Sequence, residues 1–276
     1  MMGLFFQQVD VFSQKPFRGN PVAVVYDDEC SLGKSTMQSI ASWMNLSETV
    51  FVQPSKSADY KLRIFTPRNE LTFAGHPTIG AGFSIVSRGL VNRPDFTQEC
   101  KAGIIQLSRN PEGIIMARVP EIVLENATFK SEEISDAIGE SVKDVKALNA
   151  GPLWITGRVL SKEKLMAINP DFAKISDISR RTGATGITLY SINSHKSVSV
   201  RSFAPASGIN EDPVCGSGNA CVAHHLVLTG ASVQSRYTGQ QGEALGRKGE
   251  VNVNRVDGKI WIGGKSNICI EGEIPI

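Results

Sequence analysis

The sequence has few cysteines, and their spacing is irregular. Five occur, at positions 30, 100, 215, 221 and 269. An odd number at this low density argues against a disulfide framework. The chain has no Cys-x-x-Cys pair, which argues against a structural zinc site. We therefore expect no bound metal and a reducing compartment.

Long apolar runs and a strong charge of one sign are also missing. No apolar stretch approaches the roughly 18 residues that a membrane-spanning helix needs. The N-terminus has no basic region before its apolar residues and no clear cleavage site, so it does not resemble a signal peptide. The 29 Lys and Arg nearly balance the 27 Asp and Glu, which gives no indication of a nucleic-acid or membrane partner. We expect a soluble, cytoplasmic protein.

What is present is a chain of 276 residues with 41% apolar residues, enough for one large domain or two ordinary ones. Short β-type segments separated by turn residues dominate. Helical spacing is predicted over 35–44, whereas 78–87 and 217–228 are apolar or small on all sides. A helix that is apolar all round is buried, so these two are expected inside sheets.

A change of pattern separates the two halves. Pro120 ends a strand pattern, and the charged stretch over 131–148 favours one exposed amphipathic helix within a connector. New strands begin near residue 151. The predicted domains are therefore 1–125 and 126–276, and the last residues can return to the first domain.

Internal self-similarity is the most informative feature. Arg63-Ile-Phe-Thr-Pro resembles Arg201-Ser-Phe-Ala-Pro, and each is followed by a Gly-rich helix start. Aligned on their glycines, these starts read HPTIGAG from His76 and DPVCGSG from Asp212. The sequence therefore predicts two halves, each with a strand, a polar loop and the N-terminus of a buried helix.

Helix N-termini expose free N–H groups and a positive dipole end, which suit a carboxylate or an enolate-like anion. A duplicated scaffold without chemistry is the alternative, although His, Asp, Cys and Ser flank the glycines. A dinucleotide fingerprint at Gly216-Ser-Gly218 is not favoured, because the third glycine and the surrounding βαβ pattern are missing. We expect no cofactor.

Four longer segments carry a more specific signal. They read DVFSQKPFRGNPVAVV, NLSETVFV, FTPRNELTFAGHPTIGAG and FAPASGINEDPVCGSGNA. Together, from residue 9 to about 228, they resemble the phenazine-biosynthesis PhzF-like family within the diaminopimelate-epimerase-like superfamily. The resemblance implies an α+β fold of two similar domains, each a curled, mostly antiparallel sheet or barrel around a central helix. It also implies an active site between the domains, no cofactor and a homodimer.

The resemblance assigns roles to particular residues. It implies that Glu48 is the general acid/base, and that His76 and Asp212 assist proton transfer on a small carboxylate-bearing substrate. Ser217 falls on the serine of the family's second glycine motif. The expected substrate-binding positions, including N–H groups of both helix starts, are Gly75, Cys215, Gly216, Ser217 and Gly218.

The residues themselves support these roles, with structural alternatives for each. Glu48 borders an apolar run, where desolvation raises the pKa of a carboxyl; capping or surface exposure is its alternative. His76 and Asp212 stand at predicted helix starts, where both can cap. Ser217 can bind a carboxylate or serve structure. Glu211 is expected to face solvent. Arg63 and Arg201 are interpreted as structural.

Cys215 departs from both patterns. Two-thiol epimerases of the superfamily carry a cysteine before a glycine at each helix start, whereas the aligned position in the first half is Ile79. In the PhzF-like pattern the position of Cys215 is commonly Thr or another small residue. A thiol at a helix N-terminus is expected to have a lowered pKa, and inert packing is the alternative.

The sequence thus predicts an isomerase whose principal acid/base is Glu48. An amino-acid racemase or epimerase using Cys215 remains open. So does a non-catalytic protein that binds a small molecule.

Overall fold

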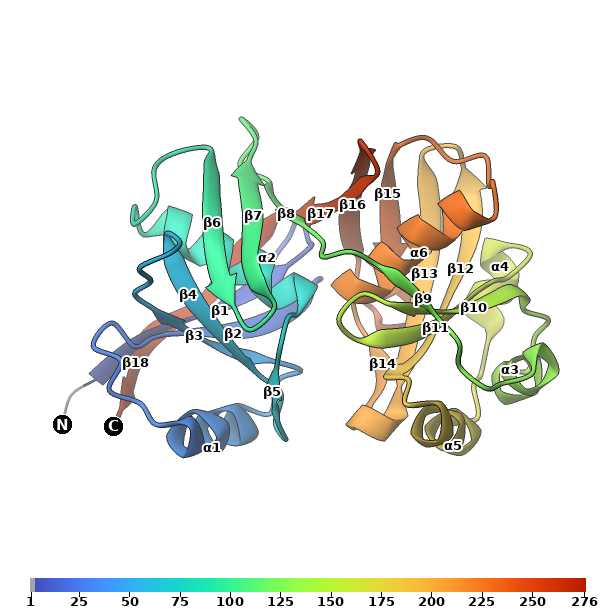
Figure 1. Ribbon diagram of the computed structural model, residues 1–276, viewed down its shortest axis with the longest axis horizontal. Coiled ribbons are helices and arrows are strands. Elements are labelled where there is room, and N and C mark those ends of the chain that lie inside the picture. The colour runs from blue at the N-terminus through green and yellow to red at the C-terminus, as the bar shows by residue number, and fades with distance from the viewer. Residues whose placement is uncertain (1–2) are drawn as a thin grey trace. The chain divides into compact units, whose positions relative to one another are not determined.

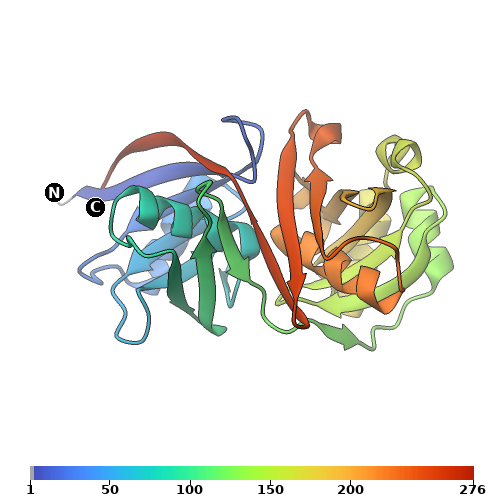
Figure 2. The ribbon, with the colours of Figure 1, turned by 90° about the horizontal axis from the view of Figure 1, so that it is seen from above.

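The computed structural model describes residues 3–276. They divide into two compact units. The first contains the described residues up to Arg118 and also Gly263–Ile276, whereas the second is Val119–Ile262. The C-terminal residues therefore belong with the N-terminal half. Strand β18 (Ser266–Pro275) pairs antiparallel with β1 (Gly3–Val11), and Figure 2 shows the two running side by side.

The first unit is a sheet in the order β18-β1-β2-β3-β4-β6-β7-β8. Two of its pairings, β2–β3 and β4–β6, are parallel, and the others in this series are antiparallel. Its remaining elements are β2 (Asn20–Tyr26), α1 (Lys34–Met44), β3 (Thr49–Gln53), β4 (Tyr60–Phe65), β5 (Glu70–Leu71), α2 (Gly75–Ser87), β6 (Asp95–Cys100), β7 (Gly103–Arg109) and β8 (Ile115–Arg118).

The second unit repeats this pattern in the order β9-β10-β11-β12-β13-β15-β16. Here β11–β12 and β13–β15 are the parallel pairs. Its elements are β9 (Val123–Glu125), α3 (Ser131–Ile138), β10 (Lys143–Asn149), β11 (Leu153–Arg158), α4 (Lys162–Ala167), α5 (Phe172–Thr182), β12 (Gly186–Ser194), β13 (Ser197–Ala204), β14 (Ile209–Asp212), α6 (Gly216–Leu228), β15 (Arg236–Gln241) and β16 (Gly249–Val256). Strand β17 (Lys259–Gly264) crosses the boundary between the units.

In each repeat a buried helix occupies the same place along the chain. It follows a two-stranded hairpin and precedes a strand that pairs in parallel with the first strand of that hairpin. Ten of the 13 residues are buried in each of α2 and α6, and Figure 1 shows each helix among the strands of its own unit. This confirms the prediction from sequence that these segments are surrounded by sheet. Close approach explains one glycine of α2, since a Cβ on Gly80 would lie 2.5 Å from Val22 Cγ1.

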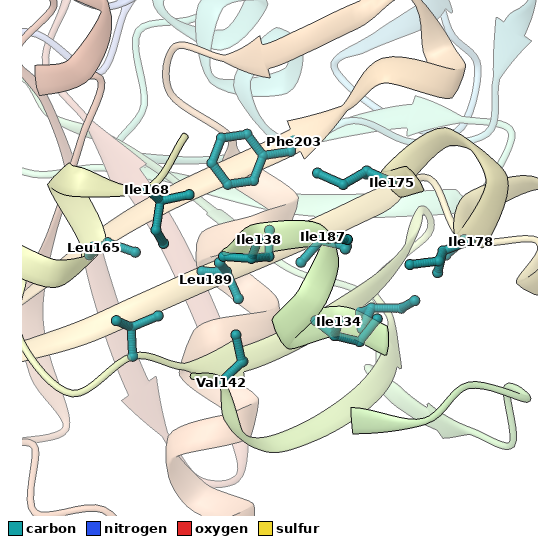
Figure 3. Close-up of a cluster of buried hydrophobic side chains, with 14 residues drawn as sticks. Ile134, Ile138, Val142, Leu165, Ile168, Ile175, Ile178, Ile187, Leu189 and Phe203 are labelled. Carbon is teal, nitrogen blue, oxygen red and sulfur yellow. The ribbon is translucent and has the colours of Figure 1, made fainter. Parts of the chain in front are cut away.

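Other helices cover the opposite face of each sheet. In the first unit, α1 packs Met37 and Ala41 into a cluster with Phe51 and Phe65. In the second, α3, α4 and α5 pack against β11, β12 and β13, as Figure 3 shows for Ile134, Leu165, Ile175 and Phe203. Both sheets are therefore covered by helices on two faces.

The prediction of one helix over 131–148 is wrong. Helix α3 ends at Ile138 because Gly139 adopts a left-handed conformation with φ of 73°, which stops the helix. The chain then forms strand β10. Residues 120–150, interpreted from sequence as a connector, thus supply β9, α3 and β10 of the second unit.

Candidate active site

Glu48 and His76 meet in the first unit. Glu48 immediately precedes β3, and His76 is the second residue of α2. Their Oε2 and Nε2 atoms lie 3.4 Å apart, with side chains 15% and 4% exposed. Burial lowers the pKa of His76 to about 3, so the imidazole is neutral at neutral pH. A carboxyl group beside a neutral imidazole can exchange a proton with it.

Local structure holds Glu48 at the start of its strand. Helix α1 ends at Met44, and the left-handed conformation of the following Asn45 turns the chain. The Ser47 hydroxyl then donates to Asn20 Oδ1 at 3.4 Å. Thr49 pairs with β2 on one side and β4 on the other. Glu48 is therefore fixed between a hydrogen-bonded residue and a central strand.

A second group gathers in the second unit around the start of α6. Asp212 ends β14, and its Oδ1 accepts the Val214 N–H at 3.0 Å. The Cys215 Sγ accepts the Gly218 N–H at 3.3 Å and lies 3.5 Å from Ser217 Oγ. Ser217 Oγ also accepts a hydrogen bond from Trp154 Nε1 at 3.0 Å. Three residues that the sequence predicts as site residues are thus neighbours.

Burial dominates the electrostatics of this group. It raises the pKa of Asp212 from 3.8 to about 6. Burial also raises the pKa of the Cys215 thiol well above its ordinary value, and the nearby Asp212 charge adds to the effect. The expectation of a lowered thiol pKa is therefore wrong, because desolvation outweighs the positive helix end. Cys215 is a neutral thiol next to a carboxyl that titrates near neutrality.

The two helix starts are equivalent in a different register from the one predicted. Both α2 and α6 have 13 residues, beginning at Gly75 and Gly216. This places Ala74 opposite Cys215, and His76 opposite Ser217. The glycine-based alignment of His76 with Asp212 is wrong by five residues, more than the usual uncertainty of helix ends. Asp212 consequently ends a strand, and Cys215 caps the helix.

A buried ion pair supports the new register in both repeats. Arg63 Nε donates to Glu70 Oε1 at 2.9 Å, and Arg201 pairs with Glu211 through two bonds of 2.8 and 2.9 Å. Arg201 also donates to the Leu165 and Ile168 carbonyls. The structural interpretation of both arginines agrees with these contacts. The expectation that Glu211 faces solvent is wrong, since its side chain is 7% exposed.

Gln241 is a member of the second group that sequence reasoning missed. Its Nε2 donates to the Asp212 carbonyl at 3.0 Å. Its Oε1 accepts from the Cys215 N–H at 3.1 Å and from Asn219 Nδ2 at 2.9 Å. The amide thereby ties the end of β14 to the start of α6. No sequence signal marked it, because it lies in a strand 26 residues from Cys215.

Within residues 3–276, no three His, Cys, Asp or Glu side chains are grouped so as to hold a metal ion. Over the same described part of the chain, no helix is long and apolar enough to cross a membrane.

Two units that share one strand pattern around buried helices define the fold class of diaminopimelate-epimerase-like proteins. A sequence model of the family described as "Phenazine biosynthesis-like protein" matches residues 9–272. The chain belongs to this family. The crystal structure of a Bacillus anthracis phenazine biosynthesis protein of the PhzF family has a TM-score of 0.86 and 24% sequence identity, with 100% of each chain covered. The predicted family and fold are confirmed.

Curated relatives extend over much of the sequence. "Antisense-enhancing sequence 1" of Schizosaccharomyces pombe is 35% identical and covers 97% of each chain. The trans-2,3-dihydro-3-hydroxyanthranilate isomerase of Pseudomonas fluorescens is 32% identical and covers 80% of this chain and 79% of the relative. Further relatives also carry isomerase names. The prediction of an isomerase is confirmed at this level.

Proposed function

We propose that the protein is a cofactor-independent isomerase that moves a proton on a small carboxylate-bearing metabolite by general acid/base catalysis. The observation that carries this proposal is the Glu48 carboxyl 3.4 Å from a buried imidazole. Such a pair can take a proton from carbon and hold it out of bulk water. The similarity to a named isomerase supports the same reaction class.

In the proposed reaction, Glu48 is the principal acid/base. Its carboxylate accepts a proton from a carbon next to a carboxylate or conjugated group, and the electron pair of the broken C–H bond shifts into that group. The same proton returns at another carbon, so no electrons leave the substrate. His76 accepts or returns the Glu48 proton while the intermediate exists.

The second group supplies binding and a second proton carrier. Helix geometry leaves the first N–H groups of α2 and α6, at Gly75 and at Gly216 and Ser217, without partners inside the helix. These groups, with the Ser217 hydroxyl, suit the substrate carboxylate and the developing negative charge. Asp212, with a pKa of about 6, exists in both protonation states near neutral pH and can relay a proton.

Solvent deuterium exchange tests the proposal. The substrate of the Pseudomonas fluorescens relative, trans-2,3-dihydro-3-hydroxyanthranilate, is the first compound to assay in D₂O, with a panel of conjugated carboxylic acids after it. We expect isomerised product or deuterium incorporation with the native chain, and a loss of at least about 100-fold in Glu48→Gln, the scale of a removed general acid/base. Glu121→Gln, an exposed glutamate, is the matched control and should retain activity.

Other outcomes of this assay contradict the proposal. Equal turnover by Glu48→Gln and the native chain would remove Glu48 as the principal acid/base. Binding of a panel compound without isomerisation or exchange would favour the non-catalytic binding protein. Retained turnover after exhaustive chelation and dialysis is expected, and a turnover that needs an added cofactor would refute cofactor independence.

Epimerisation through Cys215 is the second candidate, and the neutral thiol beside Asp212 favours it. A thiol can donate a proton to the face of a carbon opposite the base. Chiral analysis of the product separates the two reactions, since an epimerase interconverts stereoisomers and an allylic isomerase moves a double bond. Cys215→Ser should retain isomerase turnover. A loss comparable to that of Glu48→Gln would favour the epimerase.

The homodimer and the cytoplasmic location remain predictions. Light scattering coupled to size-exclusion chromatography measures the first. A mass near 30 kDa, the mass of one 29.8 kDa chain, would contradict it.

A further inference from the structure

The two nitrogens of the His76 ring have different partners. Nε2 lies 3.4 Å from Glu48 Oε2. The ring also makes a hydrogen bond with the backbone of Pro21. Because the two ring nitrogens point in different directions, the nitrogen that meets Pro21 is Nδ1. The side chain is 4% exposed, so bulk water does not compete strongly for either nitrogen.

The chemistry of proline sets the direction of that hydrogen bond. Proline has no backbone N–H, so its main chain can only accept. The Pro21 carbonyl therefore accepts, and His76 Nδ1–H donates. Pro21 lies within β2, paired with Asp10 of β1, so the carbonyl is held by two strands and does not depend on a mobile side chain.

A neutral imidazole carries a single N–H. Burial keeps His76 in this neutral form, with a pKa of about 3. Its one proton is engaged by Pro21, so Nε2 presents a lone pair toward Glu48. A carboxylate oxygen facing that lone pair would be repelled, whereas a protonated carboxyl would donate a hydrogen bond to it.

We propose that the Pro21 carbonyl holds His76 in its Nδ1–H tautomer, so that Nε2 is a proton acceptor and Glu48 carries the proton in the resting protein. In the resting protein the nitrogen facing Glu48 thus accepts a hydrogen bond and does not donate one. Pro21 is a positioning residue, since it acts through His76.

This arrangement has a consequence that rests on the proposed function. Before Glu48 can accept a proton from carbon, its own proton must leave. Transfer from Glu48 Oε2 to His76 Nε2 breaks the O–H bond and forms an N–H bond, which gives a carboxylate and an imidazolium without net charge change. The imidazolium would then donate to both Glu48 and Pro21. Substrate binding would activate the base by displacing this proton.

Nitrogen NMR tests the tautomer without a substrate. The chain has four histidines, so uniform ¹⁵N-histidine labelling gives four rings in a long-range ¹H–¹⁵N correlation. His76→Asn assigns the signal, and if that variant does not fold, removal of His195, His224 and His225 in turn assigns it by subtraction. We expect a protonated Nδ1 and an unprotonated Nε2 at pH 7. An Nε2–H tautomer or an imidazolium would overturn the proposal.

Infrared difference spectroscopy tests the proton on Glu48. We expect a carbonyl band of a neutral carboxylic acid in the native chain at pH 7, absent from Glu48→Gln and retained in Glu121→Gln. In Glu48→Gln the side-chain amide can donate to Nε2, so His76 should keep its tautomer. Absence of the band from the native chain would overturn the resting protonation of Glu48.

These outcomes are separable from those for the proposed function. The Nδ1–H tautomer without any deuterium exchange would support this inference and count against an isomerase. Deuterium exchange together with an Nε2–H tautomer would support an isomerase and count against this inference.

Discussion

Replacement of Asp212 by Asn should stabilise the protein near neutral pH while lowering its activity. The Asp212 side chain is half-buried, and desolvation raises the pKa of its carboxyl from 3.8 to about 6. Folding therefore favours the protonated form. Stability from this group is fully present below the unfolded-state pKa and is lost as the pH rises through about 6. An asparagine amide in the same place does not titrate, so its contribution to stability does not fall as the pH rises.

The magnitude follows from the pKa difference. A shift of about two pKa units corresponds to about 3 kcal/mol, at 1.36 kcal/mol per unit. Asn keeps an oxygen that can accept the Val214 N–H, the 3.0 Å bond that Asp212 makes. The stability of Asp212→Asn relative to the native chain should therefore rise by about 2–3 kcal/mol from pH 4 to pH 7, and change little above pH 7.

Urea unfolding at a series of pH values measures this difference. Trp154 and Trp261 lie in the second unit, whereas Trp43 of the first unit is already 83% exposed, so the fluorescence change on unfolding reports mainly the unit that contains Asp212. Asp177→Asn is the matched control, because that side chain is 78% exposed. The free energy of unfolding of this control should follow that of the native chain at every pH. If the free energies of unfolding of Asp212→Asn and the native chain differ by the same amount at every pH from 4 to 8, the carboxyl is not desolvated and its proposed relay role fails.

Three further changes give distinct results. Glu211→Leu leaves Arg201 buried without its carboxylate and should lower the free energy of unfolding, measured in urea, by about 3–5 kcal/mol. Asp136→Ala removes a surface pair with Lys174 and should lower it by at most about 1 kcal/mol. Equal losses in the two variants would contradict the buried pair. In Gly239→Ala the new Cβ would lie 2.0 Å from Asn219 Oδ1, so we expect the free energy of unfolding to fall by about 1–3 kcal/mol. An unchanged melting temperature would show that the Asn219 side chain can move aside without cost. Cys215 should react slowly with iodoacetamide at pH 7, since burial raises the pKa of its thiol, whereas the exposed Cys30 should react first by mass spectrometry; the reverse order would mean an activated Cys215.

Local pattern predicts the elements better than it predicts their ends. The three helices expected over 35–44, 78–87 and 217–228 occur at Lys34–Met44, Gly75–Ser87 and Gly216–Leu228. Their spacing or uniform apolarity is a strong signal. The prediction of one helix over 131–148 is wrong because the helical periodicity continues across Gly139, where the helix ends. One left-handed residue outweighs that periodicity, since it removes the geometry that the next hydrogen bonds need.

Sequence motifs predicted candidate site residues at both helix starts but misplaced their equivalence, for a physical reason. Glycine is needed wherever chains approach closely, and the two repeats meet this need at different turns of the helix. Gly82 lies within α2, where a Cβ would lie 2.8 Å from Leu107 Cδ2, whereas a Cβ on Gly218, at the start of α6, would lie 2.8 Å from Thr188 Oγ1. Aligning these glycines therefore compared the interior of one helix with the start of the other.

The corrected register strengthens the asymmetry between the halves. Cys215 lies opposite Ala74, so the first repeat still has no thiol at its helix start. His76 lies opposite Ser217, and the pairing of Arg63 with Glu70 matches that of Arg201 with Glu211. The scaffold has thus kept its buried ion pairs in both repeats while the residues at the helix starts differ. Because a neutral thiol has no counterpart across the repeat, a symmetric exchange of protons between two thiols has no residues to perform it, and the carboxyl of Glu48 remains the proposed principal acid/base.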